Sequence, residues 1–496
     1  MRISGIGLRR LFRYGQSTRK SRWLIDPIGS GQYACTPSKR LGPSALLCRG
    51  KYRGRPAGCR RCVWCLSRQR ADLEAVTMPI RADLSSRSNR RVVITGIGLR
   101  TPLGADREST WRSLVAGRSA SRWLQSPQWT ATSPLVGAPC DMPLSVTEQG
   151  VDPVIALALA ASNEAIVDAG LNVSTLATDS TGVVFGTSKG SLHTASRLLS
   201  DECSRDSADQ WLSVWPNAAA AAIAQTYGSL GPTLAPVAAC ATGLAACLRG
   251  FELIRDGRCD VVLAGSSDAS LQPAILGSFQ RLGVLARRSD DPATACRPFD
   301  RHRSGFIVGE GAGCLVFESL EHAVARGACW YAEWESGRML SDPSGLTQLD
   351  LQGQSLQRLL SDLRKEAGEL PDYMNLHGTA TLPNDRVESA AIRAVLGADA
   401  NGISYSSLKG GLGHLLGAAG SVELAASLLA IRDQTVPPTV NLETPDPDLT
   451  LDFTPRQSRQ RRIDRVWKLS LGFGGHLSAA SVCRLHGAGD RTKPGH

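Results

Sequence analysis

The 496-residue sequence contains no run of 18 apolar residues, so it offers no candidate for a membrane-spanning helix. It has no compact cysteine framework either. Its 14 cysteines are scattered along a long chain, which argues against a disulfide-stapled secreted fold and favours a reducing compartment. Charged residues make up only 20% of the chain against 42% hydrophobic residues, a balance that excludes disorder of the whole chain. At about 150 residues per domain, there is room for roughly two to four domains.

Acidic residues are nearly missing from one part of the chain. Residues 1–91 hold 21 lysines and arginines against 4 acidic residues, whereas the rest of the chain holds 35 against 41. The net charge of +11 therefore belongs to a basic leader. Because the remaining body is mildly acidic, it presents no general attraction for nucleic acid, and we expect no nucleic-acid partner.

The leader, residues 1–91, also lacks sustained hydrophobic periodicity, and three interpretations of it stay open. It can be an arginine-rich targeting sequence, a disordered basic arm, or untranslated sequence that precedes a true start at Met78. We favour the last interpretation, because a sequence of ordinary globular character begins soon after Met78.

Five cysteines of the leader raise the question of a metal site. Cys59, Cys62 and Cys65 have the spacing of thiolate ligands, and Cys35 or Cys48 could complete the set. A chance cluster is the better interpretation, because no second paired motif supports a closed four-ligand site.

From Arg91 onward, continuous apolar segments alternate with helical patterns. The predicted strands are 92–98, 182–186, 260–265, 313–318, 328–335, 372–376, 467–471 and 478–484. The predicted helices are 106–117, 152–170, 241–256, 354–368 and 415–431. Continuous apolar strands between helices predict an α/β fold with a buried parallel sheet. We expect two similar halves, 92–325 and 326–486, and a tail at 487–496.

One cysteine lies in a position that suits chemistry. An apolar stretch ends at Cys240, and small residues follow it into the predicted helix 241–256. This pattern places the thiol at a helix N-terminus, where the helix dipole and free N–H groups favour a thiolate. Cys240 is therefore a candidate nucleophile, whereas Cys247, further along the same helix, has the character of a buried structural cysteine.

Two of only eight histidines stand in unusual surroundings. His377 ends a predicted strand in the segment NLHGTAT, and His414 lies between glycines in KGGLGHLLGAAG. Glycines on both sides allow backbone or ligand to approach closely. The separations from Cys240, about 140 and 170 residues, are unlike compact zinc motifs. The three residues together indicate a catalytic set more than a metal site.

Several motifs now occur in one order. From Arg91 to about Leu485 the chain resembles the elongating β-ketoacyl-[acyl-carrier-protein] synthases of the thiolase superfamily. The motifs are, in chain order, RVVITGIGLRTPLG (91–104), ACATG around Cys240, FQRLGVLARRSDDPATACRPFDRHRSGFIVGEGAGCLVFE (279–318), HGTAT from His377, KGGLGH ending at His414, LLGAAG (415–420), PPTVNL (437–442) and GFGG (472–475).

The resemblance implies a five-layered αβαβα thiolase-like fold and a condensing activity in fatty acid or polyketide chain elongation. Cys240 is expected to accept an acyl group from a carrier thioester. His377 and His414 are expected to promote loss of CO₂ from a malonyl carrier and to stabilise the enolate, whose carbanion attacks the acyl-Cys240. No metal or redox cofactor is implied, because the carbanion comes from decarboxylation.

The resemblance also assigns residues that bind and orient. The backbone N–H groups of Cys240 and Phe473 match the oxyanion hole, and Phe473 matches the residue that gates the acyl pocket. Thr379 and Thr381 match positions that hold the phosphopantetheine arm.

Three further residues match supporting positions. Lys409 is expected to orient the His377 region, with Glu388 as its partner, and Asp385 follows the histidine motif as the family has it.

The implied partners are an acyl carrier protein, loaded with acyl or malonyl groups, and a second copy in a homodimer. Because carrier proteins are acidic, Arg281, Arg287 and Arg288 are candidates for receiving one, although structural or merely solvated arginines explain them equally well. The expected location is cytoplasmic, or organellar if residues 1–91 are a targeting segment.

Rival activities and departures from the family pattern stay in view. A degradative thiolase needs a second cysteine in the C-terminal glycine turn, and Cys483 lies eight residues past that turn. An initiating synthase favours asparagine where His414 stands. A non-catalytic chain-length-factor subunit lacks the nucleophile, but a heterodimer with this chain as its active half stays open. Departures at Ala238, Ala380 and the segment 338–353 favour a specialised paralogue.

Overall fold

A computed structural model describes residues 90–124, 135–141, 150–199, 208–287, 289–486 and 489–491 of the chain. These residues belong to one compact unit, Pro79–His496. The other unit, Met1–Met78, lies outside the described residues, as do the leader cysteines and most of the tail predicted at 487–496. No described helix combines the length and apolar character needed to cross a membrane.

Ten strands form the central sheet, in the order β10-β9-β13-β14-β8-β1-β7-β6-β4-β5. Five come from the N-terminal half: β1 (Val92–Arg100), β4 (Thr181–Thr187), β5 (Thr233–Leu234), β6 (Val261–Asp268) and β7 (Gly311–Ser319). Five come from the C-terminal half: β8 (Ala332–Ser341), β9 (Tyr373–Asn375), β10 (Ser404–Ser406), β13 (Arg465–Gly472) and β14 (His476–Cys483). The two groups join where β1 pairs with β8 through residues 92–94.

Helices occupy both faces of the sheet. Those before residue 326 are α1 (Arg107–Val115), α3 (Pro153–Asp168), α4 (Val173–Leu176), α5 (Leu192–Leu199), α6 (Ala208–Ser213), α7 (Ala218–Tyr227), α8 (Thr242–Arg255), α9 (Pro273–Arg281) and α10 (Leu320–Ala325). Those after it are α11 (Gln354–Ala367), α12 (Leu382–Leu396), α13 (Lys409–Leu412) and α14 (Ala419–Asp433). Two short ribbons complete the described strands: β2 (Arg122–Trp123) with β3 (Val136–Gly137), and β11 (Thr435–Val436) with β12 (Arg459–Gln460).

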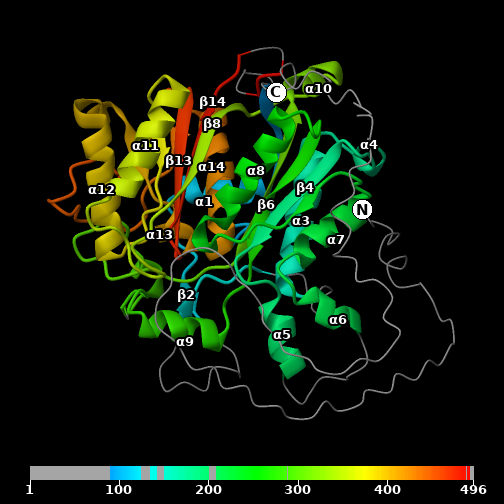
Figure 1. Ribbon diagram of the computed structural model, residues 1–496. Coiled ribbons are helices and arrows are strands. Elements are labelled where there is room, and N and C mark those ends of the chain that lie inside the picture. The colour runs from blue at the N-terminus through cyan, green and yellow to red at the C-terminus, as the bar shows by residue number, and fades with distance from the viewer. Residues whose placement is uncertain are drawn as a thin grey trace, which may run out of the picture. The chain divides into compact units, whose positions relative to one another are not determined.

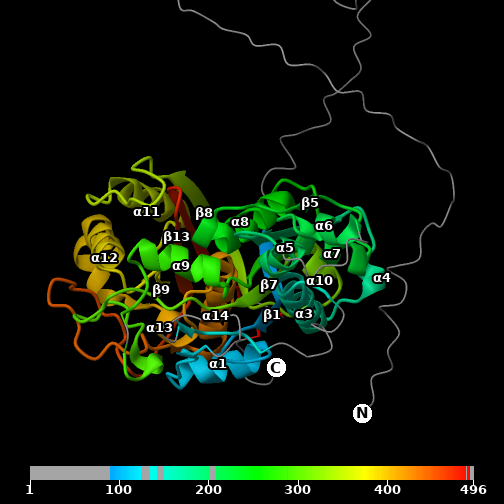
Figure 2. The same ribbon diagram turned by 90° about the horizontal axis from the view of Figure 1, so that it is seen from below.

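The elements stack in five layers, as Figures 1 and 2 show. Helices α3 and α7 cover the outer face of the N-terminal strands, and α11 and α12 cover the outer side of the C-terminal ones. Helices α8 and α14 lie between the two groups of strands, where each packs against strands of both halves. The αβαβα architecture expected from the sequence is thereby confirmed.

The expectation of a parallel sheet is wrong in part. Strand β4 runs parallel to β5 and β6, and β9 runs parallel to β10 and β13. However, β7 pairs antiparallel with both β1 and β6, and β14 pairs antiparallel with β8 and β13. A continuous apolar strand reports burial on both faces, and a layer of helices on each side buries antiparallel strands as well as parallel ones.

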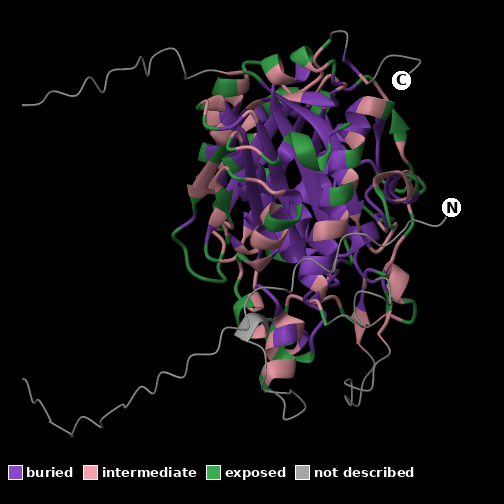
Figure 3. Ribbon diagram, turned by 90° about the vertical axis from the view of Figure 1, so that its right-hand side faces the viewer, coloured by how far each residue is buried: buried purple, intermediate pink, exposed green. Residues whose placement is uncertain are grey.

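The apolar pattern of each helix agrees with its layer. Helix α11 is amphipathic, with its buried leucines on one face: Leu356, Leu359, Leu360 and Leu363. Helix α14 is buried on every side from Ala419 to Ile431, as a helix between two sheets must be. Figure 3 shows the buried residues concentrated in the sheet and the central helices.

Glycines let the two central helices approach at their N-termini. A Cβ at Gly243 would lie 2.5 Å from the Ser421 nitrogen, and a Cβ at Gly420 would lie 2.3 Å from the Leu244 nitrogen. Such distances are too short for any side chain. The close crossing places the start of α8, which follows Cys240, beside the turn that follows His414.

Candidate active site

Cys240 lies in the 3₁₀ turn Ala239–Ala241, which leads directly into α8. Thr242 holds this turn, because its hydroxyl donates to the Ala239 carbonyl at 2.7 Å. On the other side, Gly472 at the end of β13 packs so closely that a Cβ there would lie 3.2 Å from the Cys240 nitrogen. The thiol is therefore fixed at the N-terminus of a central helix, where the sequence predicts it.

The resting thiol is protonated. Burial raises the pKa of the Cys240 thiol to about 11, while the charges of Lys189 and Lys409 and the backbone N–H of Phe473 act in the opposite direction. A helix N-terminus alone predicts a depressed thiol pKa, and this prediction is wrong here because loss of solvent outweighs the nearby positive charges. Cys240 therefore gives up its proton as it attacks.

His414 is docked through its own backbone. Its N–H donates to the Ile307 carbonyl at 2.6 Å, and its carbonyl accepts from the Gly309 N–H at 2.9 Å. The ring Nδ1 accepts from the Leu416 N–H at 3.3 Å, which places the ring proton on Nε2. Burial, followed by the charge of Lys409, holds the pKa of His414 well below its usual value. The ring is thus a neutral N–H donor.

His377 follows β9 and is positioned by a carboxylate from α12. The backbone N–H of His377 donates to Glu388 Oε1 at 2.6 Å, and the backbone N–H of Gly378 donates to Glu388 Oε2 at 2.8 Å. Burial raises the pKa of that carboxyl to about 7. Burial, followed by the charge of Lys409, holds the pKa of His377 well below its usual value. The buried Nδ1 of His377 has no hydrogen-bond partner within the described part of the chain.

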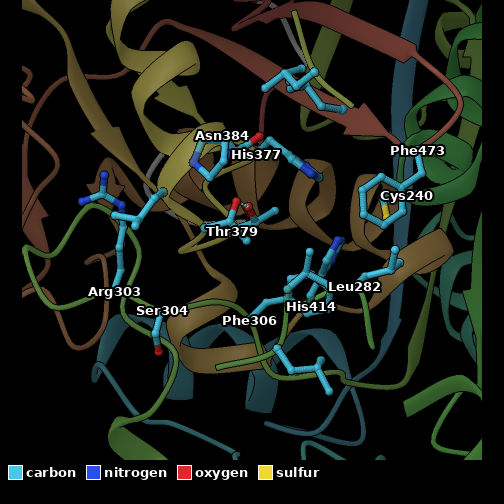
Figure 4. A pocket seen from close by; sticks show the side chains of 18 of the residues that line it. Cys240, Leu282, Arg303, Ser304, Phe306, His377, Thr379, Asn384, His414 and Phe473 are labelled. Carbon is cyan, nitrogen blue, oxygen red and sulfur yellow. Dashed lines mark hydrogen bonds between the residues drawn. The ribbon is translucent and has the colours of Figure 1, made fainter. Parts of the chain in front are cut away.

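Cys240, His377 and His414 meet at one end of a cavity of about 1440 Å³. The centroids of the two imidazole rings are 5.4 Å apart, with the rings 81° from coplanar. Figure 4 shows both rings and the sulfur at one end of the cavity, Arg303 toward the other, and Thr379 between them. The fold therefore brings together all three residues of the predicted catalytic set.

The two threonines and Asp385 occupy different places. Thr379 and Thr381 line the cavity, and their hydroxyl oxygens are 2.9 Å apart. Asp385 is fully buried, accepts from the Phe299 N–H at 2.9 Å, and lies 3.4 Å from Arg303 Nε. Burial raises the pKa of the Asp385 carboxyl to about 6. The threonines can contact a bound arm, whereas Asp385 ties the cavity wall together.

The partner expected for Lys409 is wrong. The Lys409 ammonium lies 2.6 Å from Glu423 Oε1, and both side chains are almost completely buried. Glu388, the expected partner, uses both oxygens on the backbone of the His377 segment. The two side chains point to different elements. Lys409, the first residue of α13, contacts α14, whereas Glu388 on α12 contacts the backbone at the end of β9.

Phe473 has one of the two features expected for it, a backbone donor beside the nucleophile. Its N–H donates toward the Cys240 sulfur, and its ring packs against the apolar cluster that contains Cys240, Phe306 and Leu416. It also lines the cavity. A backbone donor beside the nucleophile suits an oxyanion hole, and gating of an acyl pocket by the ring stays a prediction.

Only one of the three arginines predicted to bind the carrier lines the cavity within the described residues. Arg287 is exposed and lines the cavity, Arg281 is exposed on α9 and does not line it, and Arg288 lies outside the described residues. Three arginines that sequence reasoning missed line the same wall: Arg297, Arg301 and Arg303.

A cation beside the nucleophile was also missed. Lys189 follows β4, and its ammonium lies 2.6 Å from the Ser188 hydroxyl and 3.7 Å from Asp268 at the end of β6. Asp268 also accepts from the Gly417 N–H at 3.1 Å, in the turn after His414. Strands β4 and β6 are parallel neighbours, so polar residues at their carboxyl ends were a readable signal.

A second cation, Lys468, lies behind His377. It is fully buried in β13, where its ammonium is 2.8 Å from Glu423 Oε2. A lysine inside the apolar run VWKLSL and a glutamate inside the apolar helix of residues 415–431 were both signals of a buried pair.

Backbone strain gathers at the same site. Three non-glycine residues have positive φ there: Ala239 (46°), Ala380 (61°) and Leu416 (49°). Ala239 precedes Cys240, Ala380 lies between Thr379 and Thr381, and Leu416 lies in the turn after His414. Residues in this region of φ are disfavoured by about 1–2 kcal/mol and persist where the surroundings demand them.

Within the described residues, no group of three or more His, Cys, Asp or Glu side chains is arranged to hold a metal ion. The eight cysteines described there are free thiols.

Comparisons with known proteins agree with this geometry. Residues 89–323 match the family model described as the β-ketoacyl synthase N-terminal domain, and residues 331–443 match the corresponding C-terminal domain. The chain is 36% identical over 420 residues to the tetracenomycin polyketide synthase ketoacyl synthase alpha subunit of Streptomyces glaucescens, covering 81% of this chain and 99% of that protein. It is 36% identical over 409 residues to 3-oxoacyl-[acyl-carrier-protein] synthase 2 of Synechocystis, covering 79% and 98%.

A solved structure gives the same result. A ketosynthase bound to a hexaketide, in complex with its type II polyketide acyl-carrier protein, superposes with a TM-score of 0.73 at 33% identity. The superposition covers 80% of this chain and all of that one.

Proposed function

The chain belongs to the β-ketoacyl synthase family, and from this premise we propose that Cys240 carries the acyl group while His377 and His414 serve the decarboxylative condensation. The enzyme is a β-ketoacyl synthase, an acyltransferase that forms a carbon–carbon bond in fatty acid or polyketide chain elongation. The observation that carries the proposal is the meeting of these three side chains at one end of one cavity.

In the first half-reaction, the Cys240 sulfur attacks the thioester carbonyl of an acyl carrier. The carbon–sulfur bond to the carrier breaks, and the departing carrier thiolate takes the proton that Cys240 gives up. The oxyanion formed on the way is stabilised by the backbone N–H groups of Cys240 and Phe473. Because the charge exists only in the transition state, these donors accelerate the step without tightening substrate binding.

In the second half-reaction, a malonyl carrier enters the cavity. Its bond to the carboxylate breaks, CO₂ leaves, and the electron pair forms an enolate. Two neutral imidazole N–H groups, from His377 and His414, donate to the enolate oxygen. The enolate carbon then attacks the acyl-Cys240 carbonyl, the carbon–sulfur bond to Cys240 breaks as the β-ketoacyl carrier forms, and the released thiolate takes a proton from solvent water. The electron pair comes from decarboxylation, so the proposal requires no metal or redox cofactor.

The proposal includes an acyl carrier protein as the partner that delivers both substrates. Thr379 and Thr381 would receive the phosphopantetheine arm, and the exposed arginines at the cavity, Arg287 and Arg301, would receive the acidic carrier. The solved ketosynthase described above is bound to its carrier protein, which supports this part of the proposal.

A second copy of the chain is the other proposed partner. Strand β5 ends the sheet, and its outer edge pairs with no other described strand. Large apolar side chains are exposed on and near it: Leu230, Leu234 and Val237. More are exposed on and after α6: Trp211, Leu212 and Trp215. An unpaired apolar edge is a template for strand pairing, so we assign it to a homodimer. A ketosynthase/chain length factor is also structurally similar, at 29% identity and a TM-score of 0.72, so a heterodimer is the alternative outcome.

A cytoplasmic location suits the free cysteines and completes the proposal.

The test is intact-mass analysis of the full chain and of Cys240→Ala after incubation with acyl carriers of increasing length. An acyl adduct on the wild type that is lost in Cys240→Ala is expected, followed by a β-ketoacyl carrier once malonyl carrier is added. Absence of any adduct at every acyl length would show that Cys240 is not the acyl-carrying residue. The acyl lengths accepted also separate fatty acid from polyketide substrates.

A further inference from the structure

Lys468 is a buried charge that the mechanism above does not use. It lies in the middle of β13 with none of its side chain exposed, between the buried residues Trp467 and Leu469. A buried ammonium group costs several kcal/mol unless it is paired. A lysine at such a position therefore needs a partner and a reason.

The partner is a carboxylate that is already engaged. Glu423 on α14 lies 2.6 Å from the Lys409 ammonium through Oε1 and 2.8 Å from the Lys468 ammonium through Oε2. One carboxylate thus bridges two ammonium groups. Lys468 also donates to the carbonyl of Leu469 in its own strand. The three side chains carry a net positive charge, in a place that water does not reach.

This cluster lies directly behind His377. Lys468 is in register with Asn375 of the parallel neighbour β9, two residues before the histidine. The titratable groups that interact with Lys468 are Glu423 from α14, Lys409 from α13, Glu388 from α12, and the two histidines, His377 and His414. Glu388, whose charge acts on Lys468, also binds the His377 backbone, so it couples the cluster to the histidine segment.

We propose that Lys468 is a positioning residue for condensation: by sharing Glu423 with Lys409, it adds a positive charge behind His377 that favours the anion formed when the malonyl group loses CO₂. The inference rests on the proposed function, because Lys468 acts through the histidine that serves decarboxylation. It makes no contact with the acyl-transfer step at Cys240, so the two half-reactions should respond differently to its loss.

The charge on Lys468 depends on pH. Burial lowers the pKa of its ammonium to about 8, with the Lys409 charge acting in the same direction and Glu423 opposing both. Below that pH Lys468 is protonated and supplies its charge, and above that pH the charge is lost. The rate of CO₂ release should therefore fall as the pH rises through about 8, in a way that a purely structural lysine would not produce.

The test measures the two half-reactions separately on the full chain. Release of CO₂ from malonyl carrier and acylation of Cys240 from acyl carrier are followed between pH 6 and pH 10 for wild type, Lys468→Met and Lys468→Arg. Lys365→Met, a change of the same kind on an exposed turn of α11, serves as the matched control.

We expect Lys468→Met to release CO₂ about tenfold more slowly at pH 7, a factor that corresponds to about 1.4 kcal/mol, and to lose the alkaline fall. Acylation of Cys240 should stay within about twofold of wild type. Lys468→Arg should keep its positive charge above pH 8, so its rate of CO₂ release should not fall there. It is the decisive variant if Lys468→Met fails to fold. An unchanged CO₂ profile in a folded Lys468 variant overturns the inference, and so does an equal loss in both half-reactions. If the wild type performs neither half-reaction, the proposed function fails instead.

Discussion

At the scale of the residue, nearby positive charges act against the rise that burial causes in the pKa of the Cys240 thiol. Cys240 needs negative charge on its sulfur when it attacks, but its surroundings raise the pKa of the thiol to about 11. Lys189 is the first of the groups that act against this rise. Its ammonium is held by Ser188 and Asp268, so it stays beside the site without bonding to the nucleophile.

Lys189→Met should therefore raise the pKa of the Cys240 thiol further. Because a higher pKa leaves less thiolate at a given pH, we expect alkylation of Cys240 by iodoacetamide at pH 8 to slow by roughly threefold to tenfold. Time-resolved intact mass across a range of pH measures the shift, with Lys365→Met as control. An alkylation profile that coincides with wild type would contradict the assignment.

Glu388 gives a prediction about stability. Burial raises the pKa of its carboxyl to about 7 in the folded protein, above the ordinary value of 4.5. A group with a raised folded pKa contributes stability that is complete below the unfolded pKa and is lost as the pH rises through the folded one. Glu388 should therefore make the free energy of unfolding fall between about pH 4.5 and pH 7, by at most about 1.4 kcal/mol per pH unit.

Glu388→Gln removes this titration and keeps one acceptor for the backbone N–H groups of His377 and Gly378. The variant should show a shallower fall in the free energy of unfolding over that pH range, measured by urea unfolding at several pH values. Parallel curves for wild type and Glu388→Gln would show that the carboxyl does not titrate in this window.

At the scale of the element, strained turns fix the site more than the helices and strands do. The segment from His377 to Thr381 joins β9 to α12, and it contains Ala380 at a φ of 61°. This turn sets the spacing of the Thr379 and Thr381 hydroxyls, 2.9 Å apart. Function, not stability, accounts for a non-glycine residue held there.

Ala380→Gly should relieve the strain and loosen the turn. We expect the free energy of unfolding to rise by up to about 1 kcal/mol, since relief of the left-handed conformation exceeds the extra entropy that glycine loses on folding. The KM for carrier substrates should rise severalfold, because the two hydroxyls lose their fixed spacing. Ala390→Gly, on the exposed face of α12, is the matched control and should instead destabilise by about 1 kcal/mol without changing KM. Destabilisation in both variants would count against strain at Ala380.

At the scale of the whole molecule, the sheet has one exposed apolar end. The large side chains beside β5 do not line the cavity, so they are not explained by the active site. Their exposure is explained if a second copy covers them in solution.

Leu234→Lys should therefore weaken self-association while leaving the fold intact, because the new charge lies on the edge strand where a partner strand would pair. Sedimentation velocity should show a dimer for wild type and a larger share of monomer for the variant, at unchanged circular dichroism. Val324→Lys, which places the same charge on the exposed face of α10, should leave the dimer unchanged. A wild-type chain that sediments as a monomer would refute the assignment of this surface.

The residues of the site differ in how clearly the sequence around each one indicates its role. Cys240 stands out because small residues follow it into a helix, and the two histidines stand out because glycine and threonine flank them. Lys189, Glu423 and Lys468 carry only a weaker signal, a charged residue at a strand end or inside an apolar segment, because what matters about each is a partner more than forty residues away or on another element. The same limit explains the wrong partner for Lys409.

By itself the sequence predicted the alternation of helices and strands and pointed to the three residues proposed for catalysis, because apolar periodicity and local turn chemistry are properties of short segments. The five layers followed from the resemblance of its motifs to a known family. Only the tertiary structure decided the direction of the strands, since a strand buried on both faces has the same apolar pattern whichever way it runs. It also decided the ionisation of the site: the thiol, the imidazoles and Lys468 owe their pKa values to burial and to charges on distant elements, which come together only in the folded chain.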